Sequence, residues 1–187
     1  MNVTQQEICT ATKRVVVSQP FNQVNVSVIM ATAGLRRQTF YDFFRDKYDV
    51  LGFIYREEID HAAAYCRHYE YWPQTLTSIL RYFDDNRAFY QRVLSLDVQN
   101  APADVIRRHI STMIADVLTD MGRTEHISVA DTYVKFLQSI LSEALITALQ
   151  DWILSRNPAS LRDENEWLYH YLQDGFNGLV ERQRVEA

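Results

Sequence analysis

The chain of 187 residues is 47% apolar and contains only five glycines and four prolines. This composition is typical of a helical globular protein and excludes a disordered or low-complexity chain. The sequence contains no run of about 18 apolar residues, the length that a membrane-spanning helix needs. Its first residues do not show the basic segment followed by an apolar one that is typical of a signal peptide. The net charge of −5 is divided unevenly, because residues 1–50 carry +2 and the remainder carries −7. A mildly basic head on an acidic body favours a DNA-binding module joined to a domain with another role.

The two cysteines, Cys9 and Cys66, lie far apart and lack the short spacing of a metal-binding pair. This pattern is typical of reduced thiols rather than of a disulfide. We therefore expect a soluble cytoplasmic protein.

The N-terminal part of the chain predicts three short helices. Thr4 and Glu7 have the spacing of a capping box, which would start the first helix. Asn25 is a good N-cap for the second helix, and Gly34 suits the left-handed turn that ends it. The third helix is expected over about residues 37–44.

The second and third of these helices have the pattern of a helix–turn–helix. The apolar residues with the spacing to lock the two helices together are Ile29, Ala33, Leu35, Phe40 and Phe44. Arginine pairs with guanine and glutamine with adenine through two hydrogen bonds each, so the start of the third helix is expected to read bases in the major groove. Polar groups at the start of the second helix, a tyrosine of the third helix and a lysine beyond it are placed for phosphates. The predicted DNA contacts are Asn25, Ser27, Arg36, Arg37, Gln38, Thr39, Tyr41 and Lys47.

The rest of the chain predicts longer helices and no convincing strand. Breaks are expected at Asp84–Asn86, near Gly122 and at Asn157-Pro158. The last two helices carry apolar residues on more than one face, which a small domain cannot cover alone. Pairing with the same helices of a second copy predicts an isologous four-helix interface. The predicted interface residues are Leu141, Leu145, Trp152, Trp167, Tyr171 and Phe176.

Two sets of residues carry a resemblance to a known family. Ile29, the Ala33-Gly34 turn and the segment Tyr41–Phe44 resemble the pattern of the TetR family of bacterial transcription regulators. A narrower resemblance is to its subgroup of dihydroxyacetone kinase regulators. The residues that carry this narrower resemblance are Arg36–Tyr41, Asp46–Tyr48, Tyr71-Trp72, Leu80–Tyr82, Asn86 and Phe89-Tyr90.

The resemblance implies an all-α, TetR-like fold with a three-helix DNA-binding head over residues 1–64. A larger helical regulatory and dimerisation body would follow over residues 65–187. It further implies a homodimer that binds double-stranded DNA at a near-palindromic operator and activates a dihydroxyacetone kinase operon. The signal would come from a kinase-subunit-like partner protein. A small-molecule-responsive repressor of another operon is the alternative.

Two patterns bear on whether the chain is an enzyme or holds a metal. The neighbouring carboxylates Glu57-Glu58 and Asp84-Asp85 point apart on a helix and cannot form a facing acid–base pair. His61 and His68 share a helix face with Cys66 between them, but zinc normally takes three or four ligands. No glycine-rich phosphate loop and no hydrolase motif is present, so we expect no enzymatic activity, no metal and no cofactor.

A direct small-molecule sensor would need a pocket between the body helices. Ordinary core packing explains the aromatic residues there better. The candidate pocket residues are Trp72, Tyr82, Phe89, Tyr90, His109 and Phe136. With either kind of signal, a helix expected over residues 46–67 joins head to body. Its tilt would change the spacing of the two recognition helices of a dimer.

Overall fold

The computed structural model describes residues 1–63, 68–96 and 102–186, and within these it contains helices and no strand. The all-α fold predicted from the sequence is confirmed. The chain forms two compact units. The first, called here the head unit, comprises Met1–His61 and Asn86–Val105, and the second, the body unit, comprises Ala62–Asp85 and Ile106–Ala187. Residues 86–105 thus belong to the head unit although they follow the domain boundary predicted at residue 64.

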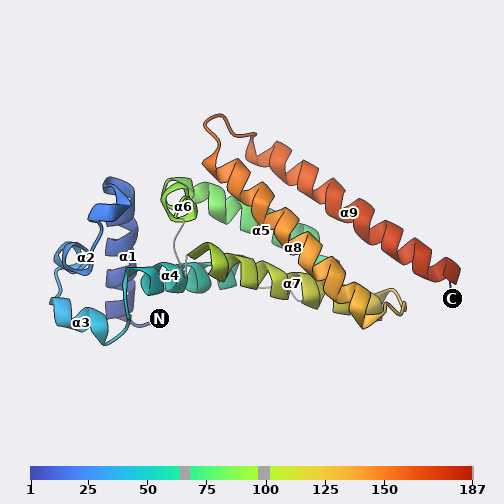
Figure 1. Ribbon diagram of the computed structural model, residues 1–187, viewed down its shortest axis with the longest axis horizontal. Coiled ribbons are helices and arrows are strands. Elements are labelled where there is room, and N and C mark those ends of the chain that lie inside the picture. The colour runs from blue at the N-terminus through green and yellow to red at the C-terminus, as the bar shows by residue number, and fades with distance from the viewer. Residues whose placement is uncertain (64–67, 97–101, 187) are drawn as a thin grey trace. The chain divides into compact units, whose positions relative to one another are not determined.

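The head unit begins with three α-helices, which Figure 1 draws in shades of blue, and it continues with a fourth that is as long as the first. Its helices are α1 (Val3–Ser18), the short 3-10 helix η1 (Phe21–Gln23), α2 (Val26–Ala33), α3 (Arg37–Tyr41), α4 (Lys47–Ala62) and α6 (Arg87–Leu94). Residues 64–67, to which the fourth helix was predicted to extend, lie outside the described residues, as does Cys66.

The first helix starts two residues earlier than predicted. Asn2 is its N-cap, and the Asn2 side chain accepts a hydrogen bond of 2.8 Å from the Gln5 amide. The Gln5 side chain accepts one of 3.0 Å from the Asn2 amide in return. The prediction of Thr4 and Glu7 as the capping box was therefore wrong. Asparagine caps at least as well as threonine, and the pair Asn2–Gln5 has the same spacing as Thr4–Glu7. Starting at Asn2 also makes the helix longer by about half a turn.

The turn between α2 and α3 has the predicted chemistry. The Asn25 side chain accepts a hydrogen bond of 3.1 Å from the Val28 amide and caps α2. Gly34 has φ of 71°, and its amide donates to the carbonyls of Ala31 and Met30. Because only glycine adopts this left-handed conformation without strain, the chain turns sharply here and starts α3 after two residues.

A continuous apolar core holds the head unit together. α1 contributes Ile8, Val15 and Val16, all at most 4% exposed. The other elements of the unit add Ile29, Met30, Phe40, Phe44, Val50, Leu51, Ile54, Tyr55, Phe89, Tyr90 and Val93. The core of the helix–turn–helix matches the prediction at Ile29, Phe40 and Phe44, whereas Ala33 and Leu35 are only half-buried.

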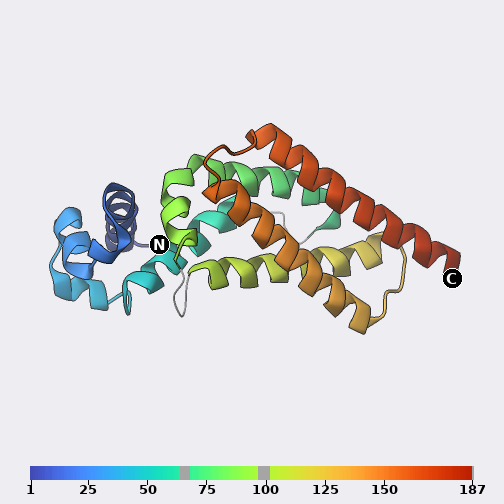
Figure 2. The same ribbon diagram turned by 45° about the horizontal axis from the view of Figure 1, so that its top comes forward.

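The body unit consists of long helices around a second core (Figure 2). Its helices are η2 (Tyr69–Tyr71), α5 (Trp72–Asp85), α7 (Pro102–Thr124, which begins within the head unit), α8 (Asp131–Leu154) and α9 (Leu161–Glu186). The breaks predicted at Asp84–Asn86 and Asn157-Pro158 are confirmed. The break predicted near Gly122 comes two residues later, where α7 ends at Thr124. Gly122 itself stays helical, because one helical glycine costs only about 1 kcal/mol and Leu118 and Met121 are buried beside it.

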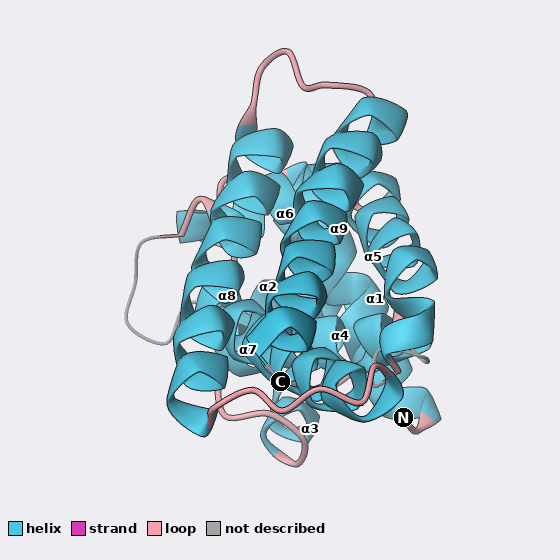
Figure 3. Ribbon diagram, turned by 90° about the vertical axis from the view of Figure 1, so that its right-hand side faces the viewer, coloured by secondary structure: helices cyan, strands magenta, loops and turns pink. Residues whose placement is uncertain are grey.

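Helices α8 and α9 run antiparallel and lie side by side, as Figure 3 shows. The Trp152 indole near the end of α8 donates a hydrogen bond of 2.9 Å to the Ala159 carbonyl in the connecting loop. Near the other end of the pair, the Arg182 guanidinium donates one of 3.1 Å to the Tyr133 hydroxyl. Among the described helices, none is long and apolar enough to cross a membrane.

Candidate nucleic-acid interface

The start of α3 presents polar side chains to solvent while its apolar side is anchored. Phe40 is fully buried and lies 5.5 Å from Phe44, ring centroid to ring centroid. Arg36, Arg37 and Gln38 are exposed. Because the anchored residues fix the rotation of this short helix, its cationic and amide groups are directed outward. That arrangement suits insertion into a groove of duplex DNA.

Arg37 is held in place by its own helix. The Arg37 guanidinium donates a hydrogen bond of 3.2 Å to the Tyr41 hydroxyl and lies 6.0 Å from the centre of the Tyr41 ring. The Tyr41 side chain is itself 51% exposed. A partly ordered arginine loses less conformational entropy on binding a base or phosphate than a free one.

Three further predicted DNA contacts lie on α2 and α3 or directly before α2. Asn25 and Ser27 are exposed at the start of α2, and Thr39 is half-buried within α3. The Asn25 side chain is already engaged, because it also donates a hydrogen bond of 3.2 Å to the Gln23 carbonyl. The free amides at the start of α2 are therefore better placed for a phosphate than the Asn25 side chain is.

Lys47 has a structural role that the sequence did not indicate. The Lys47 ammonium donates hydrogen bonds of 3.2 Å to the Phe21 carbonyl and 2.8 Å to the Val24 carbonyl. It also lies 4.2 Å from the centre of the Phe21 ring, and burial lowers the pKa of this amine. Lys47 thus joins the start of α4 to the segment before α2, and a phosphate would have to share its ammonium with two carbonyls.

Sequence reasoning missed a polar cluster that joins α1, α4 and the start of α6. The Lys13 ammonium on α1 donates hydrogen bonds of 2.9 and 2.8 Å to the two carboxylate oxygens of Glu58 on α4. It donates a third, of 2.7 Å, to the side-chain oxygen of Asn86, just before α6. One ammonium therefore links three segments of the head unit. The link was not visible in the sequence because these residues are 45 and 73 positions apart.

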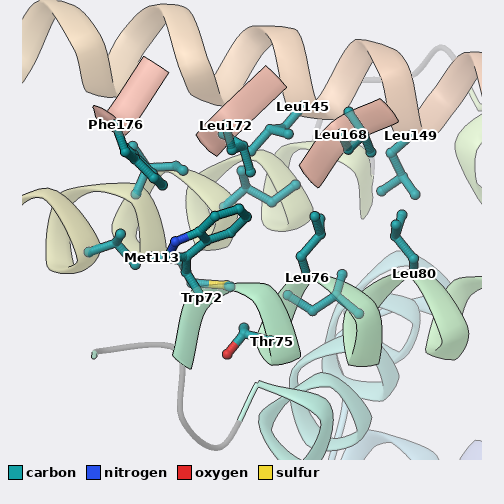
Figure 4. A pocket seen from close by; sticks show the side chains of 14 residues that line it. Trp72, Thr75, Leu76, Leu80, Met113, Leu145, Leu149, Leu168, Leu172 and Phe176 are labelled. Carbon is teal, nitrogen blue, oxygen red and sulfur yellow. The ribbon is translucent and has the colours of Figure 1, made fainter. Parts of the chain in front are cut away.

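The body unit contains an apolar cavity of about 90 Å³ (Figure 4). α5, α7, α8 and α9 all contribute to its wall, which includes Trp72, Met113, Leu149, Leu172 and Phe176. Thr75 is the one residue with a hydroxyl group among those that line it. The volume exceeds the roughly 15 Å³ that one water molecule needs, but the walls offer few partners for water.

Only Trp72 of the six candidate pocket residues lines this cavity. Phe89 and Tyr90 are core residues of the head unit instead. Tyr82 and His109 are half-buried, and Phe136 is 55% exposed on α8, where it stacks on Tyr133. The predicted set is therefore corrected to an almost entirely apolar one, because helical periodicity distinguishes buried from exposed positions but does not determine which buried side chains meet.

The residues predicted for the dimer interface separate into exposed and buried groups. Trp167 and Tyr171 are 61% and 48% exposed on α9, and Leu141 is half-buried. Leu145 lines the apolar cavity. Trp152 and Phe176 are 4% and 3% exposed and pack inside the protomer, so they offer little surface to a second copy.

The neighbouring carboxylates Glu57 and Glu58 each have a cationic partner. Glu57 lies 3.5 Å from the N-terminal ammonium, and Glu58 binds Lys13. His68 approaches Asp120, at 3.9 Å. Cys66 lies outside the described residues. Among the residues that the structure describes, no three metal-binding side chains gather at one place.

Comparison with known protein sequences gives two matches. A family model for the C-terminal region of transcriptional regulators, TetR_C_8, matches residues 70–174. The HTH-type dhaKLM operon transcriptional activator DhaS of Lactococcus lactis subsp. lactis (strain IL1403) is 36% identical over 95 residues, which is 51% of this chain and 51% of that protein. The match thus spans about half the length of this curated relative.

Solved structures share the whole fold. The structure of a dihydroxyacetone kinase operon activator, DhaS, superimposes with a TM-score of 0.74 and 24% identity, over 97% of this chain and 98% of that one. The fatty acid degradation regulator FadR from Bacillus halodurans gives 0.69 and 15%, over 92% and 95%. A TetR transcriptional regulator from Rhodococcus sp. RHA1 gives 0.61 and 13%, over 90% and 94%. The predicted TetR-like fold is confirmed.

Proposed function

The chain belongs to the TetR family of transcriptional regulators, and we propose that it acts by binding a near-palindromic DNA operator as a homodimer. The observation that carries this proposal is the start of α3, where Arg36, Arg37 and Gln38 are exposed while Phe40 is fully buried. Arginine and glutamine are the side chains that read guanine and adenine in the major groove. The amides at the start of α2 and the ammonium of Lys47 would bind phosphates and set the register.

The regulated genes are those of a dihydroxyacetone kinase operon, with activation as the effect. This part of the proposal is supported by the relative from Lactococcus lactis, whose name describes an activator of the dhaKLM operon. The signal would reach the regulator through a kinase-subunit-like partner protein. A regulator of this kind acts where the DNA is, so we expect it in the cytoplasm, and we expect it to have no enzymatic activity of its own.

A direct small-molecule signal is the second candidate, and the apolar cavity of the body unit favours it. Its walls contain almost no polar groups, so the ligand would be compact, uncharged and apolar. Replacing Leu76 at the cavity wall by tryptophan would fill the space. If such a ligand controls the regulator, Leu76→Trp abolishes its effect on operator affinity but leaves operator binding itself intact.

The test of the main proposal is a fluorescence anisotropy titration of the protein with labelled DNA from the intergenic region beside its own gene. Arg37→Ala and Gln38→Ala each weaken operator binding by about 1–3 kcal/mol and relax the preference at one base position. Arg162→Ala, an exposed arginine on α9, is the matched control and leaves affinity unchanged.

Two outcomes would contradict the proposal. Equal affinity for the operator and for unrelated DNA in the unmodified protein would remove sequence-specific binding. Unchanged affinity in both α3 variants would remove the assignment of α3 as the recognition helix. Addition of the purified kinase-subunit-like protein, with and without dihydroxyacetone, then tests the signal separately from DNA binding.

A further inference from the structure

Helix α9 carries an exposed face that no other described part of the chain covers. Residues three or four positions apart lie on one side of a helix. The exposed residues that share this face are Trp167, Tyr171, Asp174, Gly178, Arg182 and Val185. Three of them are large and apolar, with 61%, 48% and 87% of Trp167, Tyr171 and Val185 exposed. A face of this kind on a surface helix indicates an interaction site.

The sequence of this face is complementary to its own reverse. Asp174 and Arg182 are each four residues from Gly178, on opposite sides, and carry opposite charges. Tyr171 and Val185 are each seven residues from Gly178, and both are apolar. When two copies of such a helix cross antiparallel at Gly178, each aspartate faces the arginine of the other copy. Each tyrosine then faces the valine of the other copy.

Gly178 lies where such a crossing needs space. A Cβ atom added at Gly178 would meet no atom within 4 Å, and the same holds for Gly175 one turn earlier. The protomer therefore gives no packing reason for a helical glycine, although each one costs about 1 kcal/mol relative to alanine. Without a side chain at the crossing point, two helices can approach more closely than the usual 8–10 Å.

A groove of about 360 Å³ runs beside this face, between α8 and α9. Its α8 wall includes Leu137, Ile140 and Leu141, and Ile140 is 51% exposed. Arg182 lies in the groove and is already oriented, because it donates to the Tyr133 hydroxyl and lies 5.4 Å from the centre of that ring. The groove thus continues the apolar surface of α9 and provides a prepositioned cation at its edge.

We propose that the α9 helices of two copies cross antiparallel with Gly178 on the two-fold axis, paired through Asp174 and Arg182. This inference rests on the proposed dimeric function and specifies its contact residues. The isologous geometry repeats each charge pair twice, so the effect of a change at either residue is doubled. A register that brought like charges of the two helices together would be disfavoured by their repulsion, so the charges also select against other registers.

Charge reversal tests the pairing. Arg182→Glu places four carboxylates around the axis, and Asp174→Lys places four cations there. By sedimentation equilibrium, each variant is expected to dimerise at least about tenfold more weakly than the unmodified protein. The double variant, with both charges reversed, recovers most of that loss. Glu166→Lys, an exposed change on the same helix but away from the face, leaves dimerisation unchanged.

Oxidative crosslinking tests the register. In a background with Cys66→Ser, Gly178→Cys is expected to give a covalent dimer with copper–phenanthroline. A disulfide needs Cα atoms about 4.4–6.8 Å apart, and a crossing at Gly178 brings the Cα atoms of the two copies of residue 178 close together. Asn177→Cys points about 100° away around the helix and serves as the control. Cys9 is buried and does not interfere.

The outcomes separate this inference from the proposed function. A dimer that binds operator DNA but shows neither crosslinking at residue 178 nor recovery in the double variant overturns the register and leaves the function standing. A protein that stays monomeric at all concentrations and on DNA overturns both. Crosslinking at residue 178 together with recovery in the double variant supports the crossing at Gly178.

Discussion

Removing the Lys13 ammonium should destabilise the head unit, because this group links three of its segments. Lys13→Met keeps most of the apolar stem of the side chain and deletes three hydrogen bonds of 2.7 to 2.9 Å. The side chains of Lys13 and Glu58 are only 27% and 33% exposed, so solvent replaces the lost contacts incompletely.

The expected magnitude follows from the number and type of these bonds. Hydrogen bonds to charged groups contribute about 1.5–3 kcal/mol each, but bonds that share one ammonium do not add. We therefore expect the free energy of unfolding to fall by about 2–3 kcal/mol. For a chain of this size, that corresponds to a melting temperature lower by about 4–12 °C.

Urea denaturation followed by circular dichroism measures this difference, and a double-mutant cycle with Glu58→Gln isolates the pair. The cycle should return a coupling energy of about 1–2 kcal/mol. Lys135→Met is the matched control, because Lys135 is an exposed lysine on α8, and its effect should stay within about 0.5 kcal/mol. A Lys13 variant as stable as this control, with no coupling to Glu58, would refute the reasoning.

Three further predictions concern the head unit. Gly34→Ala lowers the free energy of unfolding by about 1 kcal/mol, because a φ of 71° strains a residue with a Cβ atom even though no neighbouring atom obstructs it. Gly34→Asn costs less. Equal stability of the unmodified protein and both variants in urea denaturation would contradict this. Lys47→Met lowers the free energy of unfolding by about 1–2 kcal/mol, because the hydrogen bonds to two carbonyls are lost. It also reduces the slope of log affinity for DNA against log salt concentration by about 0.9. An unchanged slope would leave Lys47 a purely structural role. Burial, followed by the charges of Glu58 and Glu57, raises the pKa of Cys9 from 9.0 to about 12. The unfolded thiol therefore loses its proton first as pH rises, so between pH 9 and 12 the native form loses stability by up to about 1.4 kcal/mol per pH unit. Cys9→Ala should remove that part of the slope in alkaline urea titrations, and identical slopes in both proteins would contradict the assignment.

Local sequence signals determined the elements of the head. Asn25 and Gly34 bracket α2 because capping and the left-handed turn depend on single residues and their immediate neighbours. The outward position of Arg36, Arg37 and Gln38 could be predicted because Phe40 and its apolar partners recur at helical spacing. The family pattern is carried by the same residues. The first cap was misplaced by two positions since Asn2–Gln5 and Thr4–Glu7 satisfy the same rule, and sequence alone does not rank them.

Tertiary structure decided which distant residues meet, because such contacts depend on how helices pack and leave no local pattern. Lys13, Glu58 and Asn86 come together from three segments. Periodicity marked Trp152 and Phe176 as apolar but could not distinguish a protomer core, where they lie, from an interface between copies. For the same reason, only the packed position of α9 shows that no atom of the protomer lies within 4 Å of a Cβ added at Gly178.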